Sequence, residues 1–281
     1  MTTDIRIEDA PITPPPPRRN GWVMTLVTLT GVVVIGALVL QAVGFGIRSS
    51  ADTRHATYAA DVEDVTELDA RISSGHLAIS FADVEEATLE VTSSGWRSDV
   101  DWRFEVDGNR LVVREQGNRW IWPDFGGSRS EAELVLPRDL EGAVSAVLDV
   151  SAGGMEVDGD LADVAIDVSA GSLVLVGAST SLEAKVSAGD ATVITSDPRT
   201  ISVRVSAGSF HGTVTGAPPE STDVHVSAGD ADLDLPDAAY AVSGGVSAGD
   251  RTIDVRTDPA SEHSLHVQVS AGDATIGYST D

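Results

Sequence analysis

Val-Ser-Ala-Gly at Val150–Gly153 is the first of seven copies of one tetrapeptide, and this motif decides the fold. The later copies are Val168–Gly171, Val186–Gly189, Val205–Gly208, Val226–Gly229, Val246–Gly249 and Val269–Gly272. Their serines, at positions 151, 169, 187, 206, 227, 247 and 270, follow one another every 18 to 23 residues. Such a repeat length is typical of proteins in which each unit buries its apolar face against its neighbours.

Apolar and polar residues alternate on both sides of each copy, as half-buried strands require. In the first copy Leu148 and Val150 precede the corner, and Met155 and Val157 follow it in a shifted phase. One straight strand cannot hold both phases, so the chain must bend at Ala-Gly. We expect glycine there because it tolerates positive φ, and alanine because it fits inside a tight corner. Each coil is then strand, corner, strand and turn, which predicts an all-β solenoid of parallel strands.

The composition excludes several classes of function. The chain of 281 residues has 44 acidic and 18 basic side chains, and its formal net charge is −26. Such a surface repels phosphate groups, so we expect no nucleic acid partner. The absence of cysteine excludes disulfides and thiolate metal sites. No catalytic sequence motif is present, and a uniform ladder lacks the two differently placed carboxyls of acid–base catalysis, so we expect no enzyme.

The N-terminal segments predict a membrane anchor. Residues 1–20 are polar and end in a proline run, which indicates a disordered cytoplasmic tail. Residues 21–47 carry no charge and exceed the roughly 20 residues of a membrane-spanning helix, so we expect one transmembrane helix in the plasma membrane. A slight arginine excess before it favours a cytoplasmic N-terminus; a cleaved signal peptide is the alternative. Residues 48–64 are expected to form a stalk, and residues 65–281 an extracytoplasmic domain.

Residues 65–145 form the irregular part of that domain, before the regular repeats of 146–281. Ile72–Gly75 is a degenerate copy of the corner, and Val91–Gly95 a weaker one. Asp107-Gly108-Asn109 predicts a hairpin turn, and Pro137 ends a predicted strand. Arg119, Trp120 and Trp122 are the candidate ligand-binding residues, suited to a glycan or a lipid headgroup. The alternative is that the aromatic rings of this part cap the open end of the solenoid.

Aspartate follows Ser-Ala-Gly in four copies, and the last three form the candidate metal site: Asp230, Asp250 and Asp273. In consecutive coils these carboxylates would stack about 4.8 Å apart and repel one another. Bound Ca²⁺, which prefers oxygen ligands, would relieve the repulsion and is the one cofactor that this pattern suits. A solvated acidic ridge without a metal is the simpler interpretation. The six histidines are scattered, with His263 and His266 the one close pair, so no transition-metal site is expected.

The repeated part, together with Ile72–Gly75, Asn109–Val113 and Leu134–Pro137, resembles the bacterial adhesin-like β-strand-repeat family of unknown function, which is related to autotransporter adhesin head domains. The resemblance implies a right-handed parallel β-solenoid over residues 65–278 and no catalytic residues. Ser172, Ser209 and Gly154 replace aspartate after three corners, which weakens the calcium interpretation.

The function expected from these observations is a non-enzymatic, single-pass envelope protein. Its adhesin-like domain would act as a surface or scaffold module that contacts cell-wall polymer, cations or another envelope protein. The alternative is a sensory or regulatory subunit of an envelope-stress response, in which the tail carries the signal. A polysaccharide-processing enzyme is the third and weakest hypothesis.

Overall fold

The computed structural model describes residues 53–94, 101–116 and 129–279. The chain separates into two compact units, Met1–Ser50 and Ala51–Asp281, and all described residues belong to the second. The tail and membrane helix expected at 1–20 and 21–47 lie outside the described residues, so both stay predictions. Within the described ranges, no helix has the length and apolar character needed to span a membrane.

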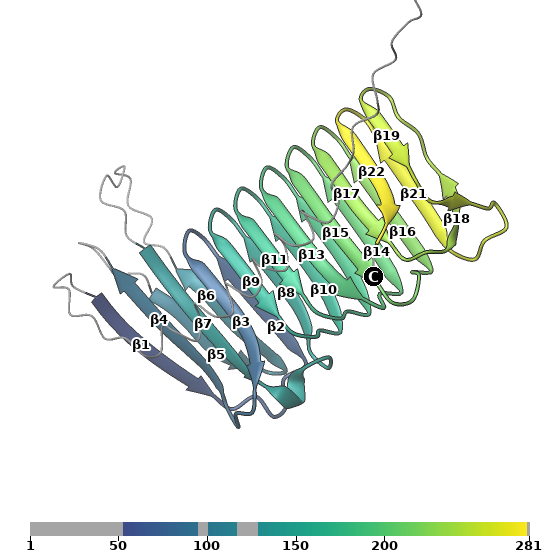
Figure 1. The fold of residues 1–281 in the computed structure, drawn as a ribbon. Helices are drawn as coiled ribbons and strands as arrows, with labels where there is room; N and C mark the ends of the chain where they lie inside the picture. Colours follow the sequence, from purple (N-terminus) through teal and green to yellow (C-terminus); the bar gives the residue numbers. More distant parts are fainter. Residues whose placement is uncertain (1–52, 95–100, 117–128, 280–281) are drawn as a thin grey trace, which may run out of the picture. The chain divides into compact units, whose positions relative to one another are not determined.

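The described residues form an all-β structure of two sheets with 11 strands each (Figure 1). The first sheet contains, in spatial order, β1 (Thr53–Ala60), β4 (Ala87–Ser94), β7 (Arg129–Pro137), β3 (His76–Ala82), β9 (Gly154–Asp158), β11 (Ser172–Val176), β13 (Asp190–Ser196), β15 (Ser209–Thr215), β17 (Asp230–Leu235), β22 (Asp273–Tyr278) and β19 (Asp250–Ile253).

The second sheet contains β20 (Arg256–Thr257), β18 (Ala239–Ser243), β21 (Ser264–Val269), β16 (Ser221–Val226), β14 (Thr200–Val205), β12 (Ser181–Val186), β10 (Asp163–Val168), β8 (Ser145–Val150), β2 (Glu67–Ile72), β6 (Arg110–Gln116) and β5 (Asp101–Asp107). One short 3₁₀ helix, η1 (Arg138–Leu140), precedes β8. The inward side chains of the two sheets form one apolar core.

From β8 to β17 the chain alternates between the two sheets, and each strand from β10 onward pairs in parallel with the strand two positions earlier. Val168 lies opposite both Val150 and Val186, so the repeated valines are in register. These valines are buried, and the residues between inward positions face outward. The sheets as a whole are mixed, because β1–β4, β4–β7 and β5–β6 pair antiparallel.

The structure corrects both reasons expected for the Ala-Gly corner. Positive φ occurs at Gly249 and Gly272 but not at the five earlier corner glycines. Glycine is required for a different reason: a Cβ on Gly189 would lie 2.2 Å from the carbonyl oxygen of Gly171 in the adjacent coil. The corner alanines, such as Ala188, are exposed rather than enclosed. The backbone hydrogen-bond ladder continues through the corner, and this close stacking leaves no room for a side chain.

The N-terminal part confirms the degenerate corner at Ile72–Gly75. Ile72 lies opposite Val150, and His76 opposite Gly154. The predicted hairpin is present as β5–β6, and β7 ends at Pro137. In the weaker copy at Val91–Gly95, residues 91–94 continue β4 and pair antiparallel with β7 instead of turning a corner, so that assignment was wrong; Gly95 lies outside the described residues.

The stalk predicted at 48–64 needs correction, since residues 53–60 form β1 at the edge of the first sheet. Most of the described side chains of β1 are exposed. An edge strand with little buried surface leaves no apolar alternation in the sequence, which is why the strand was missed.

The C-terminal end departs from sequence order. The strands β21 and β22 lie between the coil of β16–β17 and the strands β18 and β19, although β18 and β19 come first in the chain (Figure 1). Strands β18–β20 are therefore the outermost at this end. Val246, expected inside, is 47% exposed because no further coil covers it.

Candidate functional site

The predicted calcium-site residues come together, but in a different order. Asp273 lies opposite Asp230 on one side and Asp250 on the other, so Asp230 and Asp250 are not neighbours. All three side chains are exposed, and the Asp250 backbone N–H donates to Asp273 Oδ1 at 3.0 Å. Asp190 is separated from Asp230 by Ser209 of the intervening strand. A calcium ion at this row stays a prediction.

More acidic side chains extend this row along β17. Asp232 and Asp234 follow Asp230 at every second position and share its outward face. Partial burial, and secondarily the neighbouring Asp232, raise the pKa of Asp234 above its ordinary value. This end of the first sheet therefore presents a concentrated negative field.

The predicted aromatic site, Arg119, Trp120 and Trp122, lies outside the described residues. Trp102 of the same part is described and is buried on β5, the edge strand of the second sheet. Its indole Nε1–H donates to Ser130 Oγ at 3.2 Å. Trp102 thus covers the end of the core, as the capping interpretation expects.

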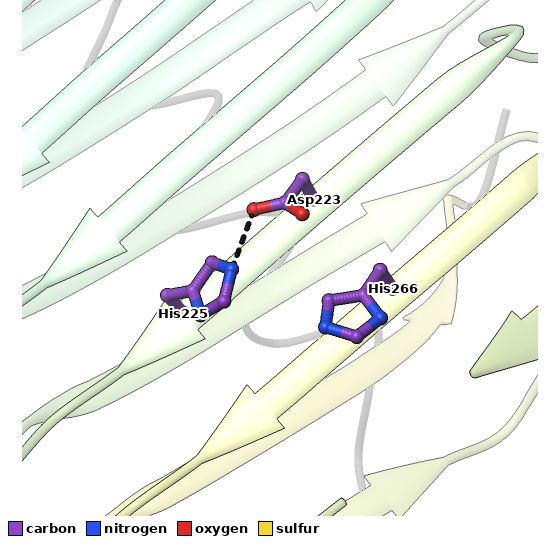
Figure 2. A group of neighbouring side chains, drawn as sticks. All are labelled: Asp223, His225 and His266. Carbon is purple, nitrogen blue, oxygen red and sulfur yellow. Dashed lines mark ion pairs between the residues drawn. The ribbon is translucent and has the colours of Figure 1, made fainter. Parts of the chain in front are cut away.

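A second group of side chains was not expected from the sequence. Asp223 and His225 on β16 and His266 on β21 each offer one ligand atom, and these atoms lie within 4.8 Å of one another (Figure 2). We call these three residues the imidazole cluster. Asp223 Oδ1 is 3.0 Å from His225 Nε2, and the two imidazole centroids are 5.5 Å apart. All three side chains are partly buried on the outward face of the second sheet.

The register of the second sheet places the cluster. Asp223 lies directly opposite His266, and His225 is two residues along the same strand, on the same face. On the far side of β21, Ser243 of β18 lies opposite His266, and its hydroxyl is 3.0 Å from His266 Nδ1. His263, which is close to His266 in sequence, contacts the carbonyl oxygen of Pro219 through Nδ1 at 2.9 Å.

Several other charged side chains on this face form ion pairs with one another. Asp69 is buried between Arg71 and Arg114, at 2.7 Å from each. Burial alone would raise the pKa of Asp69, but the two arginine hydrogen bonds outweigh it and lower that pKa. Glu183 pairs with Lys185 at 2.9 Å and Arg204 at 3.4 Å; the Lys185 hydrogen bond chiefly lowers its pKa. Arg204, opposite His225, is therefore turned toward Glu183.

The sequence contains one sign of the cluster, which is hard to see because its residues are far apart along the chain. Asp223 stands three residues before Val226, and His266 three residues before Val269, so both occupy the same repeat position. Aligned repeats would have placed them in one row. The coil of β18 and β19 stands between them in the sequence. No sequence pattern was recognised as placing that coil outside β21 and β22.

No family model and no curated protein matches this chain. Among solved structures, a candidate cell adhesion protein from Clostridium sporogenes is 10% identical, with a TM-score of 0.41 over 81% of this chain and 100% of that chain. A candidate adhesin from Parabacteroides distasonis is 13% identical, with a TM-score of 0.47 over 80% and 98%. A candidate lipid binding protein from the same species is 13% identical, with a TM-score of 0.42 over 82% and 98%. Two of these descriptions agree with the adhesin-like resemblance seen in the sequence, but similarity this low carries no argument about function.

Proposed function

We propose that this chain is a non-enzymatic envelope protein whose β domain is a surface-binding module held at the membrane by residues 21–47. The observation that carries the proposal is the repetition of outward positions. In the second sheet, Asp149, Asp167, Lys185, Arg204, His225 and Gln268 follow one another in register on successive strands. Such rows suit an extended partner, which meets equivalent positions at each step, better than a small substrate.

We infer that the coils wind as a right-handed parallel β-solenoid. The support is the route of the chain: β8 leads through β9 in the other sheet to β10, which pairs in parallel with β8. Parallel connections of this kind within one sheet are right-handed in about 98% of cases. The corner Ser and Ala side chains are exposed and therefore form a third outward row.

The charge pattern points to the class of partner. Acidic residues gather at one end of the first sheet, whereas the second sheet carries paired charges of both signs. Cell-wall polymers and envelope proteins offer hydroxyls, amines and bridging cations that match these surfaces. The acidic surface disfavours a polyanionic partner such as nucleic acid.

The test is binding to isolated cell walls of the organism that makes the chain. The full-length chain is reconstituted in neutral liposomes and sedimented with purified walls, beside a variant with Asp230, Asp232 and Asp234 changed to Asn. We expect the parent to sediment with the walls and the variant to do so several-fold less. Equal sedimentation of parent and protein-free liposomes would contradict the proposal.

The sensory alternative makes a different prediction in cells. If the tail carries a signal, removing residues 1–20 alone should abolish the phenotype of a full deletion. If the surface module is the working part, removing residues 1–20 should preserve function and removing residues 53–279 should abolish it. Staining of intact cells with an antibody to the β domain controls for correct placement of the chain that lacks residues 1–20.

A further inference from the structure

We propose that Asp223, His225 and His266 form a binding site for a divalent transition metal of the zinc class. Two imidazoles and one carboxylate are the ligand types that Zn²⁺ uses in sites that keep one position open. Imidazole donors favour Zn²⁺, Cu²⁺ and Ni²⁺ over the Ca²⁺ considered for the acidic row. The site is separate from that row, which lies on the other sheet.

The three ligand atoms are close enough together for one metal ion to reach all of them. Tetrahedral zinc with bonds of about 2.0–2.2 Å holds its ligand atoms roughly 3.3–3.6 Å apart. Asp223 Oδ1 and His225 Nε2 are 3.0 Å apart, and all three ligand atoms lie within 4.8 Å. Small side-chain rotations therefore bring the atoms to bonding distance, while the paired strands hold the backbone in place.

A buried oxygen atom supplies a second observation. Asp223 Oδ1 is shielded from solvent and makes no hydrogen bond, even though His225 Nε2 is only 3.0 Å away. The two atoms are close but not aligned for N–H donation. A buried carboxylate oxygen without a hydrogen bond is costly, and a cation placed between the two atoms would satisfy it.

The surroundings of His266 resemble the outer shell of a metal site. Ser243 Oγ binds His266 Nδ1 at 3.0 Å, which fixes the ring and leaves Nε2 for a ligand. Metal-binding histidines commonly use their second nitrogen in this way. The nearest cations do not compete: Arg204 contacts Glu183 and Ser202, and Arg251 donates to the carbonyl oxygens of Ser243 and Val267.

The site joins β16 to β21, so the metal would also stabilise the inserted C-terminal strand. All three side chains are partly exposed, which leaves a coordination position for water or a donor group from a partner. The inference does not rest on the proposed surface function, because zinc binding and wall binding are measured separately.

The test is a zinc titration of the full-length chain without a histidine tag, in detergent because residues 21–47 are apolar. We expect one Zn²⁺ per chain, competed by a chelator, and visible absorption bands when Co²⁺ is bound instead. His266→Gln should lower affinity by more than about tenfold, since loss of an outer-shell partner alone costs roughly 10- to 100-fold. Ser243→Ala should give an intermediate loss.

Two matched controls make the result decisive. His211 lies 3.3 Å from Asp232 on the other sheet, and no described residue completes a three-ligand group there; His263 is close to His266 in sequence but outside the cluster. His211→Gln and His263→Gln should each keep the affinity of the parent. Absence of stoichiometric binding by the parent, or equal binding by folded His266→Gln and the parent, would overturn the proposal. Circular dichroism verifies folding, and Ser243→Ala, which keeps all three ligands, decides the matter if His266→Gln misfolds.

Discussion

The middle of the molecule and its C-terminal end use the same repeat in different ways. From β8 to β17, order along the chain equals order in space, and each coil is covered on both sides. At the end, β21 and β22 lie inside and the earlier β18 and β19 lie outside. Unlike the middle, this end makes neighbours of residues about two repeats apart in sequence, and the imidazole cluster lies there.

The difference follows from the inward side chains of the two last coils. Strands β21 and β22 supply a complete apolar set, Leu265, Val267, Val269, Ala274 and Ile276, all buried. The coil before them has Gly244 opposite Val267 and Arg251 opposite Ala274. Arginine and glycine at inward positions cannot fill a core covered on both sides, so that coil suits the exposed end. A repeat that departs from the pattern therefore caps the stack, wherever it stands in the sequence.

The largest effect is expected from a side chain at a central corner. In Gly189→Val the Cβ would lie 2.2 Å from Gly171 O, and overpacking against backbone should cost about 3 kcal/mol or more. In the terminal coil, a Cβ on Gly245 meets only Gln268 Oε1, at 3.8 Å, so Gly245→Ala should change stability little. Chemical unfolding of both variants measures the contrast. Equal stability of the two would refute the close-stacking explanation of the corner.

The next effect is expected at the N-terminal end. Glu115 Oε2 accepts from the backbone N–H groups of Ser73, Ser74 and Gly75 at 2.8, 2.8 and 2.9 Å. In the central coils, carbonyl oxygens of the adjacent corner accept such bonds. Glu115→Ala should therefore cost about 3 kcal/mol, because three backbone donors, of which that of Gly75 is buried, lose a charged acceptor. The exposed Glu85→Ala is the control, and a loss as small as in that control would contradict this role.

A smaller effect, which depends on pH, is expected to distinguish an aspartate at the N-terminal end from one in the central coils. The lowered pKa of Asp69 means that its stabilisation is present above the unfolded-state pKa and is lost as pH falls through the folded-state pKa. Asp69→Asn should cost about 2 kcal/mol at neutral pH and less in acid. In the middle, burial and then Asp167 raise the pKa of Asp149, so its ionised form destabilises the fold. Asp149→Asn should therefore be neutral or stabilising near pH 7.

Unfolding curves of both variants at pH 7 and pH 3 provide the measurement. A loss of stability in Asp69→Asn that does not depend on pH would show that the arginine pairs are not its cause. A destabilised Asp149→Asn at neutral pH would likewise contradict the direction of the Asp149 shift.

Much of the fold was predictable because each copy of the repeat carries the same inward apolar residues and the same corner glycine. Valines in register, the corner glycines and the copy at Ile72–Gly75 all indicated parallel coils and correct pairing. Strand β1 was not predicted, because a strand at the sheet edge needs no alternation of apolar residues. The corner glycines were predicted for their positive φ, whereas the structure requires them because the backbone of the adjacent coil is too close for a side chain. The imidazole cluster was missed because contact between Asp223 and His266 depends on which coil is outermost. The order of the last two coils is a property of the tertiary structure. In the sequence, only Gly244 and Arg251 at inward positions indicate it.

Disulfide formation between introduced cysteines tests the insertion of the C-terminal strands most directly. The chain has no cysteine, so introduced pairs are unambiguous. Facing Cα atoms on neighbouring strands are about 4.8 Å apart, within the roughly 4.4–6.8 Å range that disulfides span. We predict that cysteines replacing Asp230 and Asp273 cross-link on mild oxidation, whereas cysteines replacing Asp230 and Asp250 do not, since Asp273 lies between them. Efficient cross-linking of the second pair and failure of the first would show that the coils stack in sequence order, which would contradict both the insertion and the metal site built on it.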